Sequence, residues 1–333
     1  MKIKMETVTK NFQEKILKSN DKRFLEKIFL KARNLTYEKF GKKINFYYTS
    51  TFFPPISITG KNCALDCLHC KRKLLDFMVQ APNPKILLEK CLRFWKKGAK
   101  GVLISGGCKS DFTVPLENFV DVIEKIKSKT GLFILAHTGL LDYKKAKMFV
   151  ECGIDGVALD VVGSPETTQK IYGVKIEKEK YVESLVSAKK AGFKVISPHV
   201  CVGLHFGKIK GELEALRIIA SIKPTMIVVT ALMPLPETPM KNYLVDPLDV
   251  AKIAALARLM FPDVPITLGC ARSKGKIREE IEKQTFLAGV SSIAIPTKKI
   301  YEYVKNRGFK TEFYGACCGV PPNKKFRLKK PIF

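Results

Sequence analysis

Residues 131–163, GLFILAHTGLLDYKKAKMFVECGIDGVALDVVG, show on a small scale the pattern that decides the fold. The segment begins with the apolar run GLFILAH (131–137) and ends with a second apolar run, GVALDVVG (156–163). A segment of helical length separates the two runs. Runs that are apolar on both faces and are joined in this way are typical of parallel strands with a crossover helix.

The same pattern extends over most of the chain. The other strand candidates are ISITG (56–60), GVLISGG (101–107), FKVISPHVCVG (193–203), MIVVTALMP (226–234), PITLGCA (265–271) and SSIAIP (291–296). Eight strand–helix units predict an α/β fold of the (β/α)8 TIM-barrel type. A doubly wound open sheet is the alternative that this pattern leaves open.

Two flanks adjoin the predicted barrel. Apolar side chains recur at helical spacing in the first fifty residues, which contain no strand candidate. We therefore expect a helical extension over residues 1–50, a barrel over residues 51–308 and a C-terminal tail over residues 309–333. The tail carries the adjacent cysteines Cys317 and Cys318.

The composition is strongly basic, with 59 Lys and Arg against 31 Asp and Glu and a net charge of +28. No basic–aromatic module accompanies this charge, so nucleic acid is not the expected partner. An acidic protein or an anionic substrate fits the charge at least as well. The sequence has neither a long apolar run nor an apolar core near its start, and we expect a cytoplasmic protein that does not cross a membrane.

Three cysteines stand close together in SITGKNCALDCLHCKRKLL (57–75), at Cys63, Cys67 and Cys70. In a reducing compartment, clustered cysteines are more typical of metal binding than of disulfides. A structural zinc site would need a fourth ligand, such as His69 or a distant cysteine. A [4Fe–4S] cluster on three thiolates would instead leave one iron open to bind a small molecule. The spacing alone leaves both kinds of site open.

Many chemically reactive residues follow the strand candidates directly. In α/β barrels, active sites form at and beyond the carboxyl ends of the strands. We therefore expect one active face, to which the sequence assigns Cys63, Cys67, Cys70, Gly106, Gly107, Cys108, His137, Asp160, Cys270 and Arg272.

This arrangement resembles the radical S-adenosylmethionine (SAM) superfamily, in which a C-x3-C-x2-C motif after the first barrel strand holds a [4Fe–4S] cluster. In that family the open iron binds the amino and carboxylate groups of SAM. An electron from the cluster cleaves the C5′–S bond and gives a 5′-deoxyadenosyl radical, which removes hydrogen from an unactivated carbon. The resemblance implies an enzyme with these two cofactors and with an electron donor that resembles ferredoxin or flavodoxin.

The resemblance also implies which residues bind SAM. His69 stands where the family usually has an aromatic side chain or a histidine next to the adenine. Ser105–Gly107 resembles the glycine-rich strand end that holds the SAM amino group, although Cys108 replaces the acid that usually follows. Asp160 resembles the acid that binds the ribose hydroxyls.

A further segment of the resemblance is VCVGLHFGKIKGE (200–212), which resembles the region that lines the adenine site. This segment adds Gly203 and Glu212 to the cofactor-binding candidates. His137 and His199 are candidates for contact with the substrate.

Within the superfamily, the chain resembles biotin synthase and its archaeal relatives, including the two-protein lipoyl synthases. Arg272 resembles the arginine that ligates the second cluster of biotin synthase, but Ile196 stands in place of a cysteine ligand. We expect the surplus cysteines to hold an auxiliary cluster instead. The candidate ligands are Cys108, Cys270, Cys317 and Cys318. In the alternative, Cys317 and Cys318 are exposed thiols and Cys270 only packs.

In sulfur-inserting relatives an auxiliary cluster supplies the sulfur. The resemblance therefore implies a sulfurtransferase like lipoyl synthase, which acts on an acidic octanoylated carrier protein, with a second radical SAM subunit as a further partner. Without an auxiliary cluster, a single-cluster mutase or a cofactor-assembly enzyme fits better. The alternative of another class is a non-catalytic iron–sulfur or zinc binding module.

Overall fold

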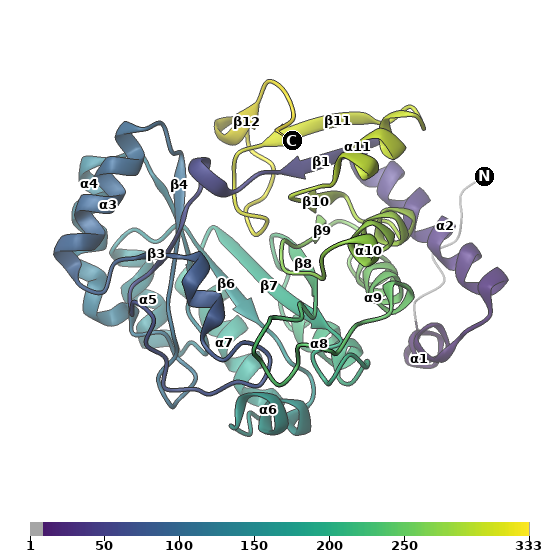
Figure 1. Cartoon of the computed structure of the whole chain (residues 1–333), viewed down its shortest axis with the longest axis horizontal. Helices are drawn as coiled ribbons and strands as arrows, with labels where there is room; N and C mark the ends of the chain where they lie inside the picture. Colours follow the sequence, from purple (N-terminus) through teal and green to yellow (C-terminus); the bar gives the residue numbers. More distant parts are fainter. Residues whose placement is uncertain (1–8, 333) are drawn as a thin grey trace.

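A single curved sheet of twelve strands organises the computed structural model, which describes residues 9–332 (Figure 1). The strands are β1 (Lys43–Tyr47), β2 (Pro55–Ser57), β3 (Val79–Gln80), β4 (Gly101–Ser105), β5 (Phe133–His137), β6 (Gly156–Asp160), β7 (Val195–Val202), β8 (Ile227–Ala231), β9 (Ile266–Leu268), β10 (Ser292–Ala294), β11 (Lys310–Tyr314) and β12 (Arg327–Leu328).

The order of the strands shows a partial barrel. The sheet runs β12-β11-β1-β10-β9-β8-β7-β6-β5-β4-β2-β3, and every pairing is parallel except that of β11 with β12. From β4 to β10 the strands follow chain order, without the reversal that a doubly wound sheet shows. In the part of the chain that the structure describes, no ladder joins β12 to β3. The predicted TIM-type fold is confirmed, with a sheet that curls without closing.

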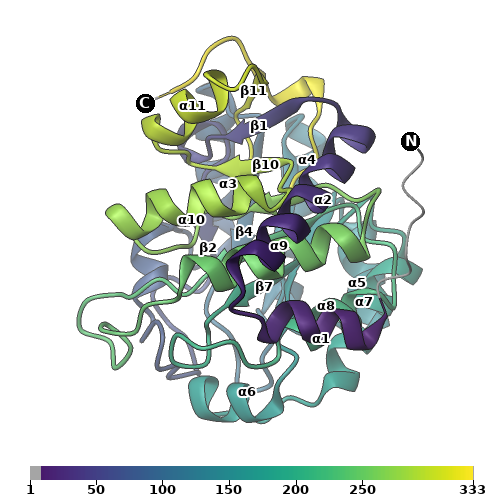
Figure 2. The ribbon, with the colours of Figure 1, turned by 90° about the vertical axis from the view of Figure 1, so that its right-hand side faces the viewer.

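Helices surround the sheet on its outer side (Figures 1 and 2). No helix among the described residues is long and apolar enough to cross a bilayer. The helices are α1 (Lys10–Lys18), α2 (Lys22–Phe40), α3 (Pro84–Lys96), α4 (Val120–Lys129), α5 (Tyr143–Glu151), α6 (Pro165–Tyr172), α7 (Lys178–Ala191), α8 (Glu212–Ile219), α9 (Pro247–Met260), α10 (Lys276–Leu287) and α11 (Lys298–Lys305), with short 3-10 helices η1 (Ser50–Phe52), η2 (Lys73–Phe77), η3 (Leu116–Phe119) and η4 (Lys324–Phe326).

Polar residues fix the points at which several helices begin. The side chains of Asn83, Ser164 and Asp246 accept hydrogen bonds from the backbone N–H groups of α3, α6 and α9. In each of these helices a proline occupies the first turn, where its missing N–H costs nothing. The helices therefore start where the loops from the strand ends require.

All eight strands predicted from the sequence are present, as β2 and β4 to β10. The expectation that the first fifty residues are helical is wrong at Lys43–Tyr47, which forms β1 between β10 and β11. Strand β11 likewise forms at Lys310–Tyr314 in the predicted tail. Both short strands pair with segments far away in the sequence, so no local pattern reveals them.

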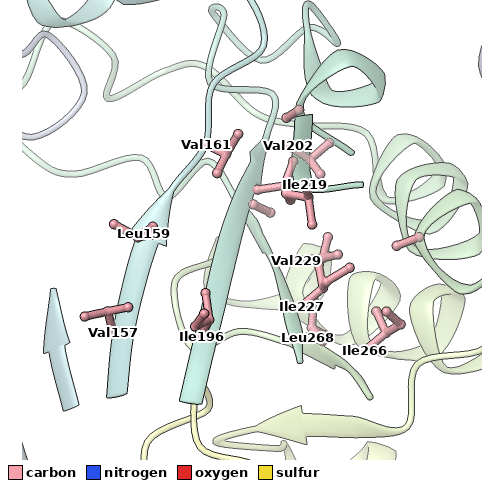
Figure 3. Packing of buried hydrophobic residues seen from close by; sticks show 14 of the residues in the cluster. Val157, Leu159, Val161, Ile196, Val202, Ile219, Ile227, Val229, Ile266 and Leu268 are labelled. Carbon is pink, nitrogen blue, oxygen red and sulfur yellow. The ribbon is translucent and has the colours of Figure 1, made fainter. Parts of the chain in front are cut away.

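The two faces of the sheet carry different cores. Side chains on the outer face, among them Val157, Ile196, Val229 and Leu268, are buried beneath the helices (Figure 3). On the inner face, residues such as Tyr47, Leu135, Ala158 and Val228 form a separate buried cluster that includes Ala316, Cys317 and Cys318 of the tail. The tail therefore fills the concave side of the sheet, where Figure 1 shows it as the yellow segment below β12.

Candidate metal centre

The loop between β2 and β3 carries the three cysteines of the C-x3-C-x2-C motif. The Sγ atoms of Cys67 and Cys70 and a ring nitrogen of His69 all lie within 4.8 Å of one another. Cys63 is close enough to interact electrostatically with Cys67. The hydrogen bond between the two thiols lowers the pKa of Cys70 to about 4 and raises the pKa of Cys67, which donates it. His69 further lowers the pKa of Cys70. Iron binds the thiolate form, so the loop fits the cluster that the motif predicts.

Helix α6 packs against this loop. The N–H of Leu68 donates to the carbonyl oxygen of Ile171 over 2.8 Å. The Tyr172 ring lies 5.6 Å from the ring of His69, centroid to centroid. Burial raises the pKa of the Tyr172 hydroxyl well above its usual value. The sequence did not single out this tyrosine, because its position in an ordinary helix gives no local signal.

The two glycines after β4 lie against the cysteine loop. A Cβ atom added to Gly107 would lie 2.1 Å from the carbonyl oxygen of Asn62 and 2.5 Å from the Cβ of Cys63. The N–H of Gly107 donates to Thr59 Oγ1 over 2.7 Å. Gly106 also has Thr59 against it, with Oγ1 at 2.9 Å from an added Cβ. We expected glycine at these positions because the backbone must approach SAM closely. The structure gives a second reason, because a side chain at either position would collide with the cysteine loop.

Cys108 lies with the cysteine loop. Its N–H donates to Cys63 Sγ over 3.3 Å, and Cys63 Sγ in turn contacts the Cys108 carbonyl oxygen at 3.7 Å. The structure does not bring Cys108 together with the other three candidates for the auxiliary cluster. The sequence showed that Cys108 follows a strand end, but it did not show which other cysteine lies next to it.

Three predicted residues meet where β5 and β6 end beside the middle of β7. His137 Nδ1 lies 3.7 Å from Asp160 Oδ2, and the rings of His137 and His199 have centroids 4.9 Å apart. Burial lowers the pKa of His199 to about 4, with His137 acting in the same direction. The His199 Nδ1–H donates to the carbonyl oxygen of Ser197 over 2.9 Å, so the neutral ring keeps Nε2 as an acceptor. Ser105 donates from Oγ to the His137 carbonyl oxygen over 3.3 Å and joins this edge.

Glu212 uses its carboxylate to close the loop after β7. Its Oε1 accepts from the N–H of Gly203 over 2.9 Å, and Oε2 accepts from the N–H of Lys210 over 2.6 Å. Burial raises the pKa of Glu212 to about 7. The two predicted residues Gly203 and Glu212 therefore bind each other and fix the shape of the loop.

A second group of thiols comprises Cys317 and Cys318, which are buried at the inner face of the sheet, and Cys270, which is exposed after β9. Cys270 and Cys318 share a hydrogen bond, which raises the pKa of Cys270. Cys318 also forms a hydrogen bond with the Cys317 thiol. The bond with Cys270 lowers the pKa of Cys318, whereas the bond with Cys317 and burial raise it. The net result is a pKa of about 12 for Cys318. The buried Tyr47 hydroxyl, which interacts with both tail thiols, has no hydrogen-bond partner. Three cysteine thiols, which as thiolates are the usual ligands of iron–sulfur clusters, therefore lie near a buried hydroxyl without a partner. This set of groups fits an iron–sulfur cluster.

Arg272 is committed to a buried ion pair. Its Nη2 donates to Glu282 Oε1 over 2.5 Å and to the Ala294 carbonyl oxygen over 2.7 Å, while Nη1 donates to the Gly269 carbonyl oxygen over 2.5 Å. Both side chains of the pair are fully buried. Of the guanidinium nitrogens, Nε is the one without a partner. This geometry gives Arg272 a structural role. Its guanidinium also interacts with the Cys270 thiol, and the expected contact with a cluster or substrate stays a prediction.

Comparison with known proteins identifies two regions. The family model described as the radical SAM superfamily matches residues 57–216, and that of the Biotin and Thiamin Synthesis associated domain matches residues 228–313. The biotin synthase of Neorickettsia sennetsu is 28% identical over 248 residues, which cover 72% of this chain and 74% of the relative. The biotin synthase of Buchnera aphidicola is 26% identical over 285 residues, with 83% and 80% covered.

Solved structures share the fold. Methylornithine synthase superposes with a TM-score of 0.66 at 19% identity, covering 92% of this chain and 94% of that chain. HydG, a maturase of the [FeFe]-hydrogenase, gives 0.69 at 19% identity, with 92% and 72% covered. The chain belongs to the radical SAM superfamily and, within it, to the biotin synthase-like branch. Enzymes of this superfamily use a [4Fe–4S] cluster and SAM and need an electron donor, and biotin synthase-like members carry a second iron–sulfur cluster.

Proposed function

We propose that this radical SAM enzyme inserts sulfur into an unactivated aliphatic chain, as lipoyl synthases do, on an octanoylated lysine of an acidic carrier protein. The observation that carries the proposal is the second thiol group, in which the exposed Cys270 is hydrogen-bonded to Cys318 beside Cys317 at the inner face of the sheet. A sulfur-inserting enzyme needs such a group to hold its sulfur source.

The proposed reaction would use two iron–sulfur clusters, each held by its own group of cysteines. Cys63, Cys67 and Cys70 would hold the [4Fe–4S] cluster, which together with SAM supplies the 5′-deoxyadenosyl radical. Asp160 exposes 54% of its side chain, so its carboxylate is free to bind the ribose hydroxyls. The three cysteines of the second group would hold the auxiliary cluster.

His199 would orient the substrate chain between the two centres. It contacts the His137 ring on one side, and on the other its Cε1 lies 3.5 Å from a Cβ added to Gly319 in the tail. Because its ring stays neutral, it brings no charge to a site that must hold an alkyl chain. The buried inner face around it excludes water from a reactive carbon radical.

The relatives and the charge support the chemistry and the partner. The matched relatives are named biotin synthases, and the second family model is named for biotin and thiamin synthesis. Ile196 faces the helices on the outer side of the sheet, so the expectation that it occupies the position of a cluster ligand is wrong. Its neighbour Ser197 meets Gly319 of the tail on the inner face and is not a cysteine either. The engagement of Arg272 by Glu282 likewise favours a substrate other than that of biotin synthase. A net charge of +28 would attract an acidic carrier domain.

The test is a direct assay for sulfur in the product. The enzyme, reconstituted anaerobically with iron and sulfide, would receive SAM, a chemical reductant and an octanoyl-lysine peptide from an acidic carrier domain. Mass spectrometry should detect replacement of hydrogen by sulfur on the octanoyl chain, and a second radical SAM subunit would be added if only one sulfur enters. SAM cleavage with an unmodified peptide, and with turnover of dethiobiotin in a parallel reaction, would refute the lipoyl proposal.

A further inference from the structure

Cys108 is a fourth thiol beside the three motif cysteines. Its backbone is bound to the cysteine loop at two points, since its N–H donates to Cys63 Sγ over 3.3 Å and its carbonyl oxygen accepts from the N–H of Ala64 over 2.8 Å. Its thiol is near enough to interact electrostatically with Cys63, Cys67 and Cys70. The chain therefore offers four thiols to a cluster that needs three.

The Cys108 thiol also interacts electrostatically with Asp160, the carboxylate that we expect to bind the SAM ribose. SAM held by Asp160 and by the open iron would therefore bring its amino and carboxylate groups close to Cys108. Cys63 and Cys108 both line a hollow of about 360 Å³, so the Cys108 thiol has room to rotate while its backbone stays fixed.

We propose that Cys108 ligates the open iron of the cluster while SAM is absent, and that SAM displaces it. The inference goes beyond sulfur insertion and depends only on the binding of the cluster and SAM. A thiolate binds iron more strongly than water does, so an open iron with a cysteine in reach takes it as a ligand.

The exchange balances without electron transfer. In the SAM-free state, the Cys108 thiol loses its proton to solvent and Sγ forms a bond to iron. When SAM arrives, its ammonium group loses a proton, its amino nitrogen and carboxylate oxygen form bonds to that iron, and the bond to Cys108 Sγ breaks. The released thiolate takes up one proton, so the exchange needs no other reactant. Cys108 therefore competes with SAM, and its removal should tighten SAM binding.

The experiment compares spectra of the SAM-free enzyme. Cys108→Ala and the near-isosteric Cys108→Ser would be made in a Cys270→Ala/Cys317→Ala/Cys318→Ala background, so that only the motif cluster contributes. Cys152→Ala is the matched control, because this buried thiol donates to the Phe149 carbonyl oxygen far from the cysteine loop. Each protein would be labelled with 57Fe and measured by Mössbauer spectroscopy, by EPR after reduction, and by SAM titration.

Without SAM, the parent and Cys152→Ala should show four similarly thiolate-ligated irons, whereas Cys108→Ala should show one distinct iron. With SAM, all spectra should coincide. The Kd for SAM should fall at least about tenfold in both Cys108 variants, which is a difference of about 1.4 kcal/mol. Identical SAM-free spectra and an unchanged Kd would overturn the proposal. If Cys108→Ala takes up no cluster, Cys108→Ser decides by the same criteria. No substrate is present, so the result is independent of sulfur insertion.

Discussion

The buried ion pair of Arg272 and Glu282 shows how strongly one residue can determine local structure. Glu282 Oε1 also accepts from Arg278, and Oε2 accepts from the N–H and the hydroxyl of Thr297. The pair thereby joins the segment after β9 to α10 and to the start of α11. We expect Glu282→Gln to lower the free energy of unfolding by about 3–5 kcal/mol, because it leaves the Arg272 charge buried without a partner.

Urea denaturation would measure this loss, with Glu280→Gln as the matched control. Glu280 is on the same helix but is exposed and accepts a hydrogen bond from the side chain of Gln284, so its substitution should change stability by less than about 0.5 kcal/mol. Equal stability of Glu282→Gln and the parent would contradict the structural role that we assign to Arg272.

Glu212 should make stability depend on pH. Its pKa is about 7 in the folded protein, above the ordinary value of 4.5, so the folded state binds the proton more tightly than the unfolded state. The contribution of Glu212 to the free energy of unfolding should therefore be largest below pH 4.5 and should be lost as the pH rises through about 7. The fall attributable to this group is at most about 3 kcal/mol.

Glu212→Gln provides the comparison, since its amide does not titrate. Denaturation of both proteins between about pH 4 and pH 8 would give the difference in their free energies of unfolding, which should decline for the parent relative to the variant across that window. A difference that stays constant with pH would mean that the two backbone donors keep the Glu212 carboxylate ionised in the folded state.

At the scale of elements, the contact between the end of β4 and the cysteine loop should control cluster binding. In Gly107→Ala, the new Cβ would lie 2.1 Å from the Asn62 carbonyl oxygen, so the loop must move. We expect this variant to lose most of the iron of the motif cluster while its circular dichroism stays unchanged. Gly131→Ala is the control, because nothing lies within 4 Å of its added Cβ. Full iron content in Gly107→Ala would contradict the close packing.

Elements with strong local patterns could be predicted from the sequence. The eight apolar strands and the C-x3-C-x2-C loop depend on neighbours in the chain, and the sequence revealed them. Strands β1 and β11 escaped prediction because they pair with each other from opposite ends of the chain. The site follows the same rule. The motif cysteines were assigned by spacing, whereas the association of Cys108 with Cys63 and of Arg272 with Glu282 depends on tertiary contacts.

For the whole molecule, the net charge of +28 should appear in the kinetics with a carrier protein. If the substrate is an acidic octanoylated domain, kcat/KM should fall about tenfold between about 50 and 300 mM salt, because added ions screen the long-range attraction. A short neutral octanoyl-lysine peptide is the control, and its kcat/KM should change little. An equal response of the two substrates would show that the charge serves another partner.

The most direct test of the account is the iron content of anaerobically reconstituted protein, because the central claim is that two separate thiol groups hold two clusters. Wild type should bind about eight irons if both clusters are [4Fe–4S], and Mössbauer spectra would confirm the cluster type. The Cys63→Ala/Cys67→Ala/Cys70→Ala variant and the Cys270→Ala/Cys317→Ala/Cys318→Ala variant should each keep about four. A wild type with about four irons and a motif variant with none would contradict the second cluster and, with it, sulfur insertion.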